Sequence, residues 1–458
     1  MNALITISLL AIFILYLGLF KANRALLPVT LVGLLLALGF SLAEWDKNAV
    51  AIFNNMMQYD NFAIAFSGIT IASTILVLLL SKDYFERISS NIAEYYSLIL
   101  FALAGIILMV SYHNLSMLFI GIEIMSVSLY ILAGIRKRDF ASNEASLKYF
   151  LMGAFSTGFL LFGIALLYGA TGSFDLEGIR SYIVLTQHVS PLLYAGILLL
   201  FVGLSFKVGA APFHFWTPDV YEGSPSLITA FMSTVVKTAG FAAFLRIVMF
   251  CFAPLQDFWI PVLVTISALS LLVGNITAVY QQHFKRMLAY SSISHVGYML
   301  FGIIALNGTS DNAVFVYAAA YSVATIIAFA ALIILQRQVG NDSFDSFNGL
   351  ARKNPFLALT LTIAMLSLAG IPLTAGFVGK FLMFSRALSS YHTYLVVFAV
   401  INAVISIFYY FRVIMAMYFK PEERSALNVP AYFKLVLAFS ALVTILLGIY
   451  PDFIASLI

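Results

Sequence analysis

Long apolar runs separated by short polar segments dominate the pattern of this chain. A helix needs about 20 consecutive apolar residues to cross a bilayer. The pattern predicts membrane spans near residues 3–20, 25–43, 62–80, 95–112, 115–134, 147–169, 191–211, 226–251, 258–281, 287–306, 313–336, 356–387, 391–419 and 431–449. The first run is expected to be a membrane helix, because it lacks the basic start and the small-residue cleavage site of a signal peptide. We therefore expect an all-α, polytopic membrane protein with about fourteen helices.

Composition supports this expectation and excludes several classes of protein. Of 458 residues, 62% are hydrophobic and only 10% are charged, which excludes an ordinary soluble domain and leaves no room for a sizeable extramembrane domain. The formal charge of +4 is too small to suggest nucleic-acid binding. The single cysteine, Cys251, excludes cysteine-ligated zinc and iron–sulfur clusters, and the six histidines lack the spacing of a metal site. Any redox centre is therefore expected in another chain.

The basic residues in the connections predict the orientation, because Lys and Arg accumulate on the cytoplasmic side of a membrane. With the N-terminus outside, the inner connections hold 14 basic residues: Lys21, Arg24, Lys82, Arg87, Arg136, Lys137, Arg138, Lys285, Arg286, Arg337, Arg352, Lys353, Lys420 and Arg424. The outer connections hold 4: Lys47, Arg180, Arg246 and Arg386. We therefore expect both termini on the outer side.

Two of the predicted spans contain a helix-breaking motif, GAAP at residues 209–212 and GIPL at residues 370–373. An unbroken helix over 356–387 would be about 48 Å long, well beyond the roughly 30 Å core of a bilayer. Pro212 and Pro372 lie five spans apart. Two spans separated by an odd number cross the membrane in opposite directions, so we expect two inverted repeats. The alternative is a chance placement of two prolines. The expected organisation is a three-helix segment at 1–94, a first repeat at 95–257, a second at 258–425 and a last helix at 426–458.

Several ionisable residues lie deep inside predicted spans, far from their ends: Glu123, Lys207, Lys237, His295 and Lys380. A central Lys or Asp costs roughly 2.5 to 3.5 kcal/mol on insertion scales. Three lysines and one glutamate would thus cost about 10 to 14 kcal/mol if they were unpaired and dry. We expect them to face each other or water.

Each of these residues also has a structural interpretation. A lysine in a membrane helix can extend its side chain to the membrane interface. For Lys148, which lies near a helix end, this structural interpretation is as good as a functional one. His295 fits a hydrogen-bonded structural role as well as a relay role, and Glu123 fits a simple counter-ion for one lysine. The set as a whole, with many Ser, Thr and Tyr residues on neighbouring spans, fits a proton wire better than a solute pocket. His214, Trp216, Asp219 and Glu222, after the first break, fit either a proton entry or a solvated loop.

Five motifs carry a family resemblance: FKVGAAPFHFWTPDVYEGSP at 206–225, EASLKYF at 144–150, AYSSISHVGY at 289–298, LAGIP at 368–372 and GFVGKF at 376–381. They closely resemble the antiporter-like membrane subunits of respiratory complex I, over essentially the whole chain. The VYEGSP ending resembles subunit N, the homologue of mitochondrial subunit 2. Subunit M has a glutamate where this chain has Lys380, and subunit L has a long lateral helix at its C-terminus, whereas this chain stops just after its last span; both differences favour subunit N.

The resemblance implies functions for the buried residues. Glu123 matches the helix-five glutamate of the family, Lys207 the helix-seven lysine and Lys237 the helix-eight lysine. Lys380 matches the helix-twelve lysine, while Lys148 and His295 match connecting positions. The implied fold has fourteen helices, with inverted five-helix repeats in which helices seven and twelve are broken.

The resemblance also implies a setting and partners. The chain would be a subunit of a proton-pumping NADH:quinone oxidoreductase, in a bacterial inner membrane beside other membrane subunits. FMN, iron–sulfur clusters and quinone are expected in partner subunits, and no cofactor or metal in this chain. Two alternatives stay open: a subunit of a multisubunit sodium/proton antiporter, and a structural subunit whose buried charges only lock helix packing.

Overall fold

The computed structural model describes residues 1–46, 50–82, 84–88, 91–186, 189–306, 310–389, 392–421 and 426–451. The chain divides into two compact units, the first formed by Met1–Gly209 and Val235–Val262 and the second by Ala210–Thr234 and Leu263–Ile458. The short segment 210–234 therefore belongs to the second unit, although most of its neighbours in sequence belong to the first.

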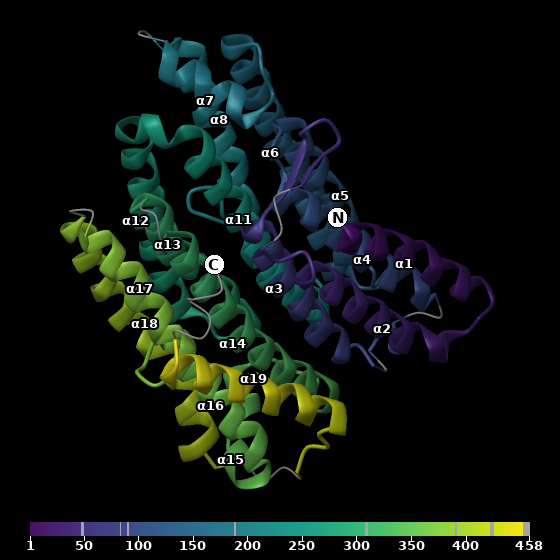
Figure 1. Cartoon of the computed structure of the whole chain (residues 1–458). Coiled ribbons are helices and arrows are strands. Elements are labelled where there is room, and N and C mark those ends of the chain that lie inside the picture. The colour runs from purple at the N-terminus through teal and green to yellow at the C-terminus, as the bar shows by residue number, and fades with distance from the viewer. Residues whose placement is uncertain are drawn as a thin grey trace. The chain divides into compact units, whose positions relative to one another are not determined.

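Helices make up most of the first unit, drawn from purple to teal in Figure 1. Its elements are α1 (Asn2–Leu19), α2 (Asn23–Leu42), β1 (Val50–Ile52), β2 (Met57–Tyr59), α3 (Asn61–Leu79), the 3₁₀ turn η1 (Phe85–Arg87), α4 (Ile92–Ser111), α5 (Leu115–Ala133), α6 (Phe140–Thr171), α7 (Leu176–Leu185), α8 (Pro191–Val208), α11 (Lys237–Ile247), the π turn η3 (Val248–Phe252) and the 3₁₀ turn η4 (Ala253–Leu255).

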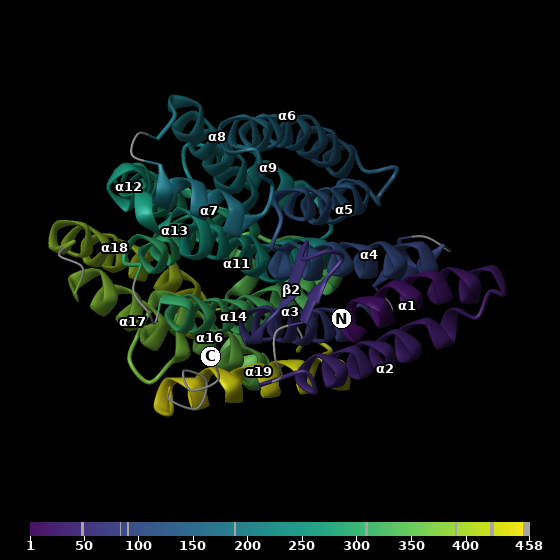
Figure 2. The ribbon, with the colours of Figure 1, turned by 45° about the horizontal axis from the view of Figure 1, so that its top comes forward.

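The second unit contains α9 (Trp216–Gly223), α10 (Ser226–Phe231), α13 (Phe284–Ile304), α14 (Ser310–Val339), the 3₁₀ turn η5 (Phe344–Phe347), α15 (Leu350–Lys353), α16 (Pro355–Ala369), α17 (Ala375–Ser389), α18 (Thr393–Phe419) and α19 (Ala431–Ile449). The π turn η2 (Met232–Val236) and the helix α12 (Gln256–Tyr280) run from one unit into the other. In Figure 2, α13 and α14 are drawn in teal and green, and both are almost entirely buried.

Small residues let the helices of the first unit approach closely. A Cβ atom on Gly105 of α4 would lie 2.7 Å from the backbone oxygen of Gly121 on α5, and one on Gly163 of α6 would lie 2.9 Å from that of Gly196 on α8. Close contact at small residues is the usual way in which membrane helices pack, since burial of apolar surface gives no driving force in lipid. These contacts bring α4 against α5 and α6 against α8.

The structure confirms an all-α membrane protein. Among the described residues, twelve helices are long and apolar enough to cross a membrane, and one of them is the 55-residue run Ser226–Tyr280, longer than one crossing needs. The total of fourteen spans and the inverted repeats stay predictions. Pro212 lies between α8 and α9, and Pro372 lies between α16 and α17. The helices before them end at glycines in the left-handed conformation, Gly209 with φ +76° and Gly370 with φ +84°, which no other residue type adopts as readily.

Several local details differ from the sequence expectations. The segment after Pro212, expected as a connection, contains the short helix α9, in which Trp216 is buried. An antiparallel hairpin, β1–β2, and the amphipathic helix α7 also lie in segments for which no regular structure is predicted. Helix α6 begins at Phe140 rather than near 147, so Lys148 lies within it.

Two basic residues counted in connections are buried in helices. Arg246, counted as an outer charge, lies on α11 and is fully buried, and Lys285, counted as an inner one, lies in the first turn of α13 and is 3% exposed. The count used position along the sequence alone, and both residues lie near a span end. Lys47 and Arg424 lie outside the described residues.

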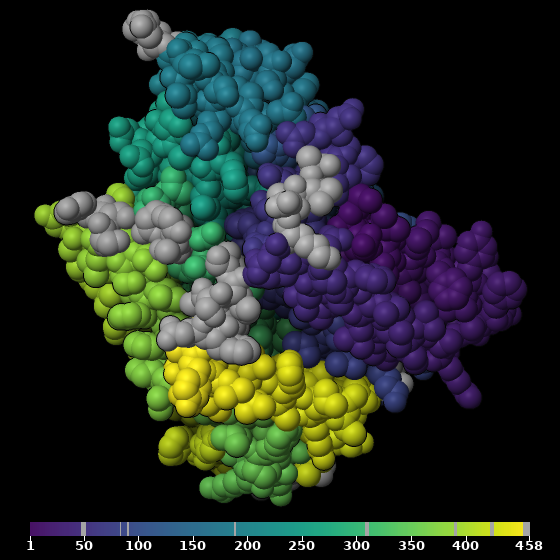
Figure 3. Space-filling view, in the orientation of Figure 1, coloured from purple at the N-terminus to yellow at the C-terminus, as the bar shows by residue number. Residues whose placement is uncertain are grey.

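The outer faces of several helices carry large exposed apolar side chains. On α2, Val32, Leu35 and Leu36 are all more than half exposed; the surface of α1 and α2 is drawn in purple in Figure 3. Such faces are typical of helices that lipid or another membrane subunit covers.

Candidate functional site

Lys207 is the centre of a polar contact in the first unit. Its side chain is buried, and its ammonium donates hydrogen bonds to Ser126 Oγ on α5 at 2.9 Å and to Thr157 Oγ1 on α6 at 3.5 Å. Lys207 lies in the last turn of α8, which Gly209 ends. The negative end of the helix dipole therefore stabilises the charge of this lysine.

Glu123 lies one turn before Ser126 on the same helix and interacts electrostatically with Lys207. Its Oε1 atom is buried and has no hydrogen-bond partner among the described residues. The hydroxyl of Tyr130 is in the same situation. It points at α6, where a Cβ atom on Gly153 would lie 2.1 Å from it. Glu123 Oε1 and the Tyr130 hydroxyl are thus buried polar atoms that can each form a further hydrogen bond.

Lys237 is the first residue of α11, directly after the π turn η2, and is 2% exposed. Single π turns inside helices are frequent at functional sites. One turn later, a Cβ atom on Gly240 would lie 2.8 Å from Val208, the neighbour of Lys207. The absence of a side chain at Gly240 therefore lets α11 approach α8 at the level of the two lysines.

Lys148 differs from the other candidates. Its ammonium lies 2.8 Å from Glu144 Oε1, one turn earlier on α6, and the two side chains are 41% and 45% exposed. An exposed pair of this kind contributes little to stability. The structure therefore does not bring Lys148 into the buried contact around Lys207.

In the second unit, His295 on α13 has both ring nitrogen atoms engaged. Nδ1 lies 2.8 Å from the hydroxyl of Tyr317 on α14, and Nε2 lies 3.0 Å from the hydroxyl of Tyr410 on α18. The Tyr410 hydroxyl also lies 2.5 Å from Ser291 Oγ. Hydroxyl groups both donate and accept, so His295 is part of a continuous hydrogen-bonded chain across three helices.

Lys380 on α17 is buried and reaches back to the end of α16. Its ammonium donates to the backbone oxygens of Leu368 at 3.0 Å and Ala369 at 2.9 Å. Its stem lies over Gly370, where a Cβ atom would approach Lys380 Cδ to 2.7 Å. The helix break therefore exposes carbonyl groups that stabilise a buried cation.

Tyrosines connect His295 with Lys380. The ammonium of Lys380 lies 4.8 Å from the ring centre of Tyr298, one turn after His295 on α13. Tyr317, which bonds the histidine, packs on α17 at Gly379, next to Lys380; a Cβ atom on Gly379 would lie 2.2 Å from the Tyr317 ring. The sequence predicts that hydroxyl side chains lie near the charged residues, but not that Tyr298 and Tyr317 are the ones. Which tyrosines contact His295 and Lys380 is determined by how the helices pack.

The structure thus groups the candidates into two clusters. Glu123, Lys207 and the segment beginning at Lys237 belong to the first unit, and His295 and Lys380 belong to the second. The described residues hold no group of three or more His, Cys, Asp and Glu side chains arranged for a metal ion. Both clusters consist of groups that exchange protons.

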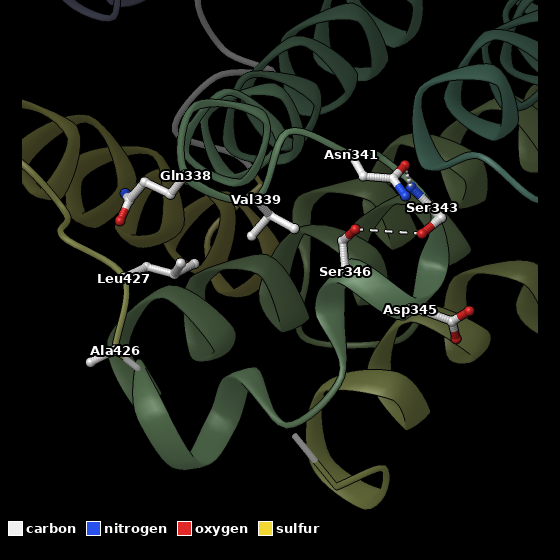
Figure 4. A pocket seen from close by; sticks show the side chains of 8 residues that line it. All are labelled: Gln338, Val339, Asn341, Ser343, Asp345, Ser346, Ala426 and Leu427. Atoms are coloured by element: carbon white, nitrogen blue, oxygen red, sulfur yellow. Dashed lines mark hydrogen bonds between the residues drawn. The ribbon is translucent and has the colours of Figure 1, made fainter. Parts of the chain in front are cut away.

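A polar pocket elsewhere in the second unit is lined by none of the candidate residues. It lies where α14 ends, and Figure 4 shows Gln338 and Asn341 at its wall and Ser343 and Ser346 joined by a hydrogen bond. Its lining carries no group that matches the buried clusters. The chemistry indicated by the sequence therefore does not extend to this pocket.

Comparison with known proteins identifies the family. Residues 111–406 match the profile of the family described as NADH:quinone oxidoreductase/Mrp antiporter, transmembrane. NADH-quinone oxidoreductase subunit N of Flavobacterium psychrophilum is 41% identical to this chain, and the match covers 100% of both. The chain belongs to the NADH-quinone oxidoreductase subunit N family. The resemblance seen in the sequence motifs is thereby confirmed.

Solved structures agree with membership of the subunit N family. A chain of respiratory complex I from Thermus thermophilus with bound aureothin has a TM-score of 0.85 and 34% identity, with 99% of this chain and 98% of that chain covered. A chain of the Mrp complex from Dietzia sp. DQ12-45-1b has a TM-score of 0.88 over 99% of this chain and 95% of that chain, at 18% identity. The Mrp likeness shows a shared fold and no more.

Proposed function

We propose that this chain is a proton-translocating membrane subunit of an NADH:quinone oxidoreductase, in which quinone reduction in partner subunits drives proton transfer along its buried Lys, Glu and His residues. The observation that carries this proposal is Lys207, a buried cation held by two hydroxyl groups beside a carboxylate. Burial disfavours a charged lysine and a nearby carboxylate favours it, so movement of Glu123 would load or unload a proton.

The residues of the first unit would take up the proton and those of the second would release it. In this scheme Glu123 and Lys207 set the charge near the inner half-channel, and Lys237 is the central relay. His295 then passes the proton to Lys380 and the outer exit. Buried polar atoms are almost always hydrogen bonded. Glu123 Oε1 and the hydroxyls of Tyr130 and Tyr298, which have no hydrogen-bond partner among the described residues, would therefore mark positions where water completes the path. Lys148, half exposed beside Glu144, would serve at the inner end.

Family membership and the charge count support the proposed setting. The chain would lie in a bacterial inner membrane with both termini outside, next to other antiporter-like and small membrane subunits. FMN, iron–sulfur clusters and quinone would be held by partner subunits, because Cys251 is the one cysteine here. The expected division into a segment at 1–94, repeats at 95–257 and 258–425 and a last helix at 426–458 belongs to this proposal.

Replacement of Lys237 by Ala tests the scheme. In membrane vesicles that contain the assembled complex, we expect NADH oxidation to lose its coupled proton uptake. Normal proton uptake per NADH by an assembled Lys237→Ala complex would refute the relay. The exposed Lys353 provides a matched control, since Lys353→Ala removes the same charge outside the proposed path and should leave pumping unchanged.

Two other functions make different predictions. The family profile includes Mrp antiporters, and an antiporter subunit would show sodium-driven proton flux in a complex without flavin or quinone reductase activity. A structural subunit would lose assembly when its buried charges are removed, while proton uptake per assembled complex stayed normal. Analysis of flavin, iron and quinone reductase activity in the purified complex distinguishes a proton pump of the oxidoreductase from an antiporter subunit. The Lys237→Ala measurement distinguishes the proton pump from a structural subunit.

A further inference from the structure

A basic pocket lies in the first unit where α4 begins and α5 ends. It has a volume of about 590 Å³, and its lining includes Arg87, Arg136, Lys137, Arg138, Asp139 and Tyr95. Among the described residues, the lining of this cavity thus carries four cations and one carboxylate. None of these residues belongs to the proton path proposed above, and all of them lie in connections or helix ends on the predicted inner side.

The charges of this basic pocket are only partly compensated within the chain. Arg136 lies 3.7 Å from Asp139 and donates to the Tyr84 hydroxyl at 3.3 Å. Arg87, Lys137 and Arg138 form no ion pair with a carboxylate in the part of the chain that the structure describes. Like charges around one cavity repel each other, and an anion that enters the cavity removes this repulsion. The pocket therefore favours an anionic ligand.

The surroundings of the pocket are those of a membrane interface. Tyr95, which lines it, is 6% exposed and packs on the ring of Phe85, with 5.3 Å between the ring centres. In the last two turns of α5, which precede the pocket residues along the chain, Val127 and Ile131 are 50% and 52% exposed. Apolar surface thus adjoins the basic pocket at the end of the same helix. An acidic peptide would use the charges alone, whereas a ligand with an anionic head and an apolar tail matches both surfaces.

We propose that the basic pocket binds the phosphate group of an anionic phospholipid of the inner leaflet, whose acyl chain lies along the exposed face of α5. Guanidinium groups bind phosphate oxygens through paired hydrogen bonds, and Arg136 and Arg138 both line the pocket. Basic pockets at the cytoplasmic ends of membrane helices are the usual sites for such headgroups. The ligand would bridge α4 and the α5–α6 connection, and its binding does not depend on whether this subunit pumps protons.

The test uses the purified, delipidated complex, to which phosphatidylglycerol or phosphatidylcholine is returned and bound lipid is counted by native mass spectrometry. Arg87→Ala/Arg138→Ala removes two exposed charges from the pocket. At about 1 kcal/mol per basic residue near a membrane surface, we expect phosphatidylglycerol to bind roughly 30-fold more weakly at this site, with phosphatidylcholine binding unchanged. Arg352→Ala/Lys353→Ala removes two exposed charges on the same predicted side outside the pocket and should bind lipid like the unmodified complex.

Three results would overturn the proposal. The first is equal binding of phosphatidylglycerol by the pocket variant and the control variant. The second is displacement of the lipid by millimolar inorganic phosphate, which would show that free phosphate is the ligand. The third is efficient cross-linking of Arg138→Cys to an acidic segment of another subunit in place of lipid. If the alanine variant does not assemble, Arg87→Lys/Arg138→Lys keeps the charges but loses the paired guanidinium contacts. We then expect phosphatidylglycerol to bind more weakly than in the unmodified complex, and unchanged binding would overturn the proposal.

Discussion

The ammonium group of Lys285 lies 2.5 Å from the backbone oxygen of Ser224. It also donates to the backbone oxygen of Glu222 at 2.9 Å, so this lysine of α13 satisfies two carbonyl groups at the end of α9. The next residue, Arg286, binds the carboxylates of Asp219 and Glu222. The helix α9, which follows the first helix break, is therefore held against α13, the helix that carries His295. The sequence alone left open whether this segment is a proton entry or a solvated loop.

Replacement of Lys285 by Met should destabilise the chain strongly. The side chain is 3% exposed, so its loss leaves buried carbonyl groups without a donor, and hydrogen bonds to charged groups contribute about 1.5 to 3 kcal/mol each. We expect a lower unfolding temperature of the purified complex and less assembled enzyme. Lys285→Arg should recover part of the loss. An unfolding temperature as high as that of the control Lys353→Met would show that the α9 contact contributes nothing.

Ser126 should matter for proton transfer, while Ser128 on the same helix should not. Ser126 Oγ accepts a hydrogen bond from Lys207, whereas Ser128 Oγ donates to the backbone oxygen of Ile124. Ser126→Ala leaves the buried ammonium with one fewer partner, at a cost of about 1 to 3 kcal/mol. We expect proton uptake to slow by about tenfold or more in Ser126→Ala vesicles and to stay normal in Ser128→Ala vesicles. Equal rates in the two variants would contradict the proposed role of the Lys207 contact.

The hydroxyl of Tyr317 should be required for transfer through His295. Tyr317→Phe keeps the ring that packs on Gly379 and removes only the partner of Nδ1 at 2.8 Å. We expect proton uptake per NADH to fall several-fold while the assembled amount of complex stays the same. Tyr280 is 74% exposed on α12, and Tyr280→Phe serves as the matched control. A structural role for His295 predicts instead that Tyr317→Phe lowers the unfolding temperature without changing the proton uptake per assembled complex.

Hydropathy alone located most of the long apolar helices, but not α7 and α9, because the cost of charge and open backbone in lipid leaves few other arrangements for a membrane span. The same cost singled out Lys207 and Lys380 as unusual. The partners of these lysines could not be predicted from the sequence. Ser126 and the carbonyl of Leu368 are partners because of the way in which the helices pack, which hydropathy does not show. Periodicity gives little help here, because helices that are apolar all round have no distinct buried face.

Charge counting was least reliable at helix ends. Arg246 and Lys285 were assigned to connections, yet both are buried with several acceptors. Sequence position near a span end does not tell whether a long side chain turns outward to water or inward to backbone oxygens. The hairpin β1–β2 was not predicted for a different reason. Its three-residue strands are too short to show an alternating pattern.

A glycine substitution tests the packing between Tyr317 and α17. A Cβ atom on Gly379 would lie 2.2 Å from the Tyr317 ring, whereas Gly158 on α6 has nothing within 4 Å of the same position. Gly379→Ala should therefore cost about 1 to 3 kcal/mol through overpacking. Gly158→Ala should be neutral or slightly stabilising, as alanine favours a helix over glycine. The unfolding temperatures of the two variants in detergent provide the measurement, and a Gly379→Ala chain as stable as the Gly158→Ala chain would contradict this packing.

The ion pair between Arg246 and Asp60 should be the most sensitive contact of the first unit. Arg246 is fully buried and binds both carboxylate oxygens, at 3.1 and 2.9 Å, and its Nε donates to the backbone oxygen of Tyr112 at 2.8 Å. Asp60 also accepts from the backbone NH of Ala63 and so caps α3. Removal of one partner of a buried pair costs about 3 to 5 kcal/mol, because the other charge stays buried alone.

Arg246→Met should therefore abolish assembly of the chain, and Arg246→Lys should recover only part of it, since an ammonium cannot bind both oxygens as a planar guanidinium does. The double variant Arg246→Met/Asp60→Asn removes both charges and keeps a side chain able to cap α3. We expect it to assemble better than Arg246→Met alone, because no unpaired charge is left. The amount of chain in the purified complex measures this. If the double variant assembled less well than the single one, the two residues would contribute independently and the pair would not explain the stability of this region.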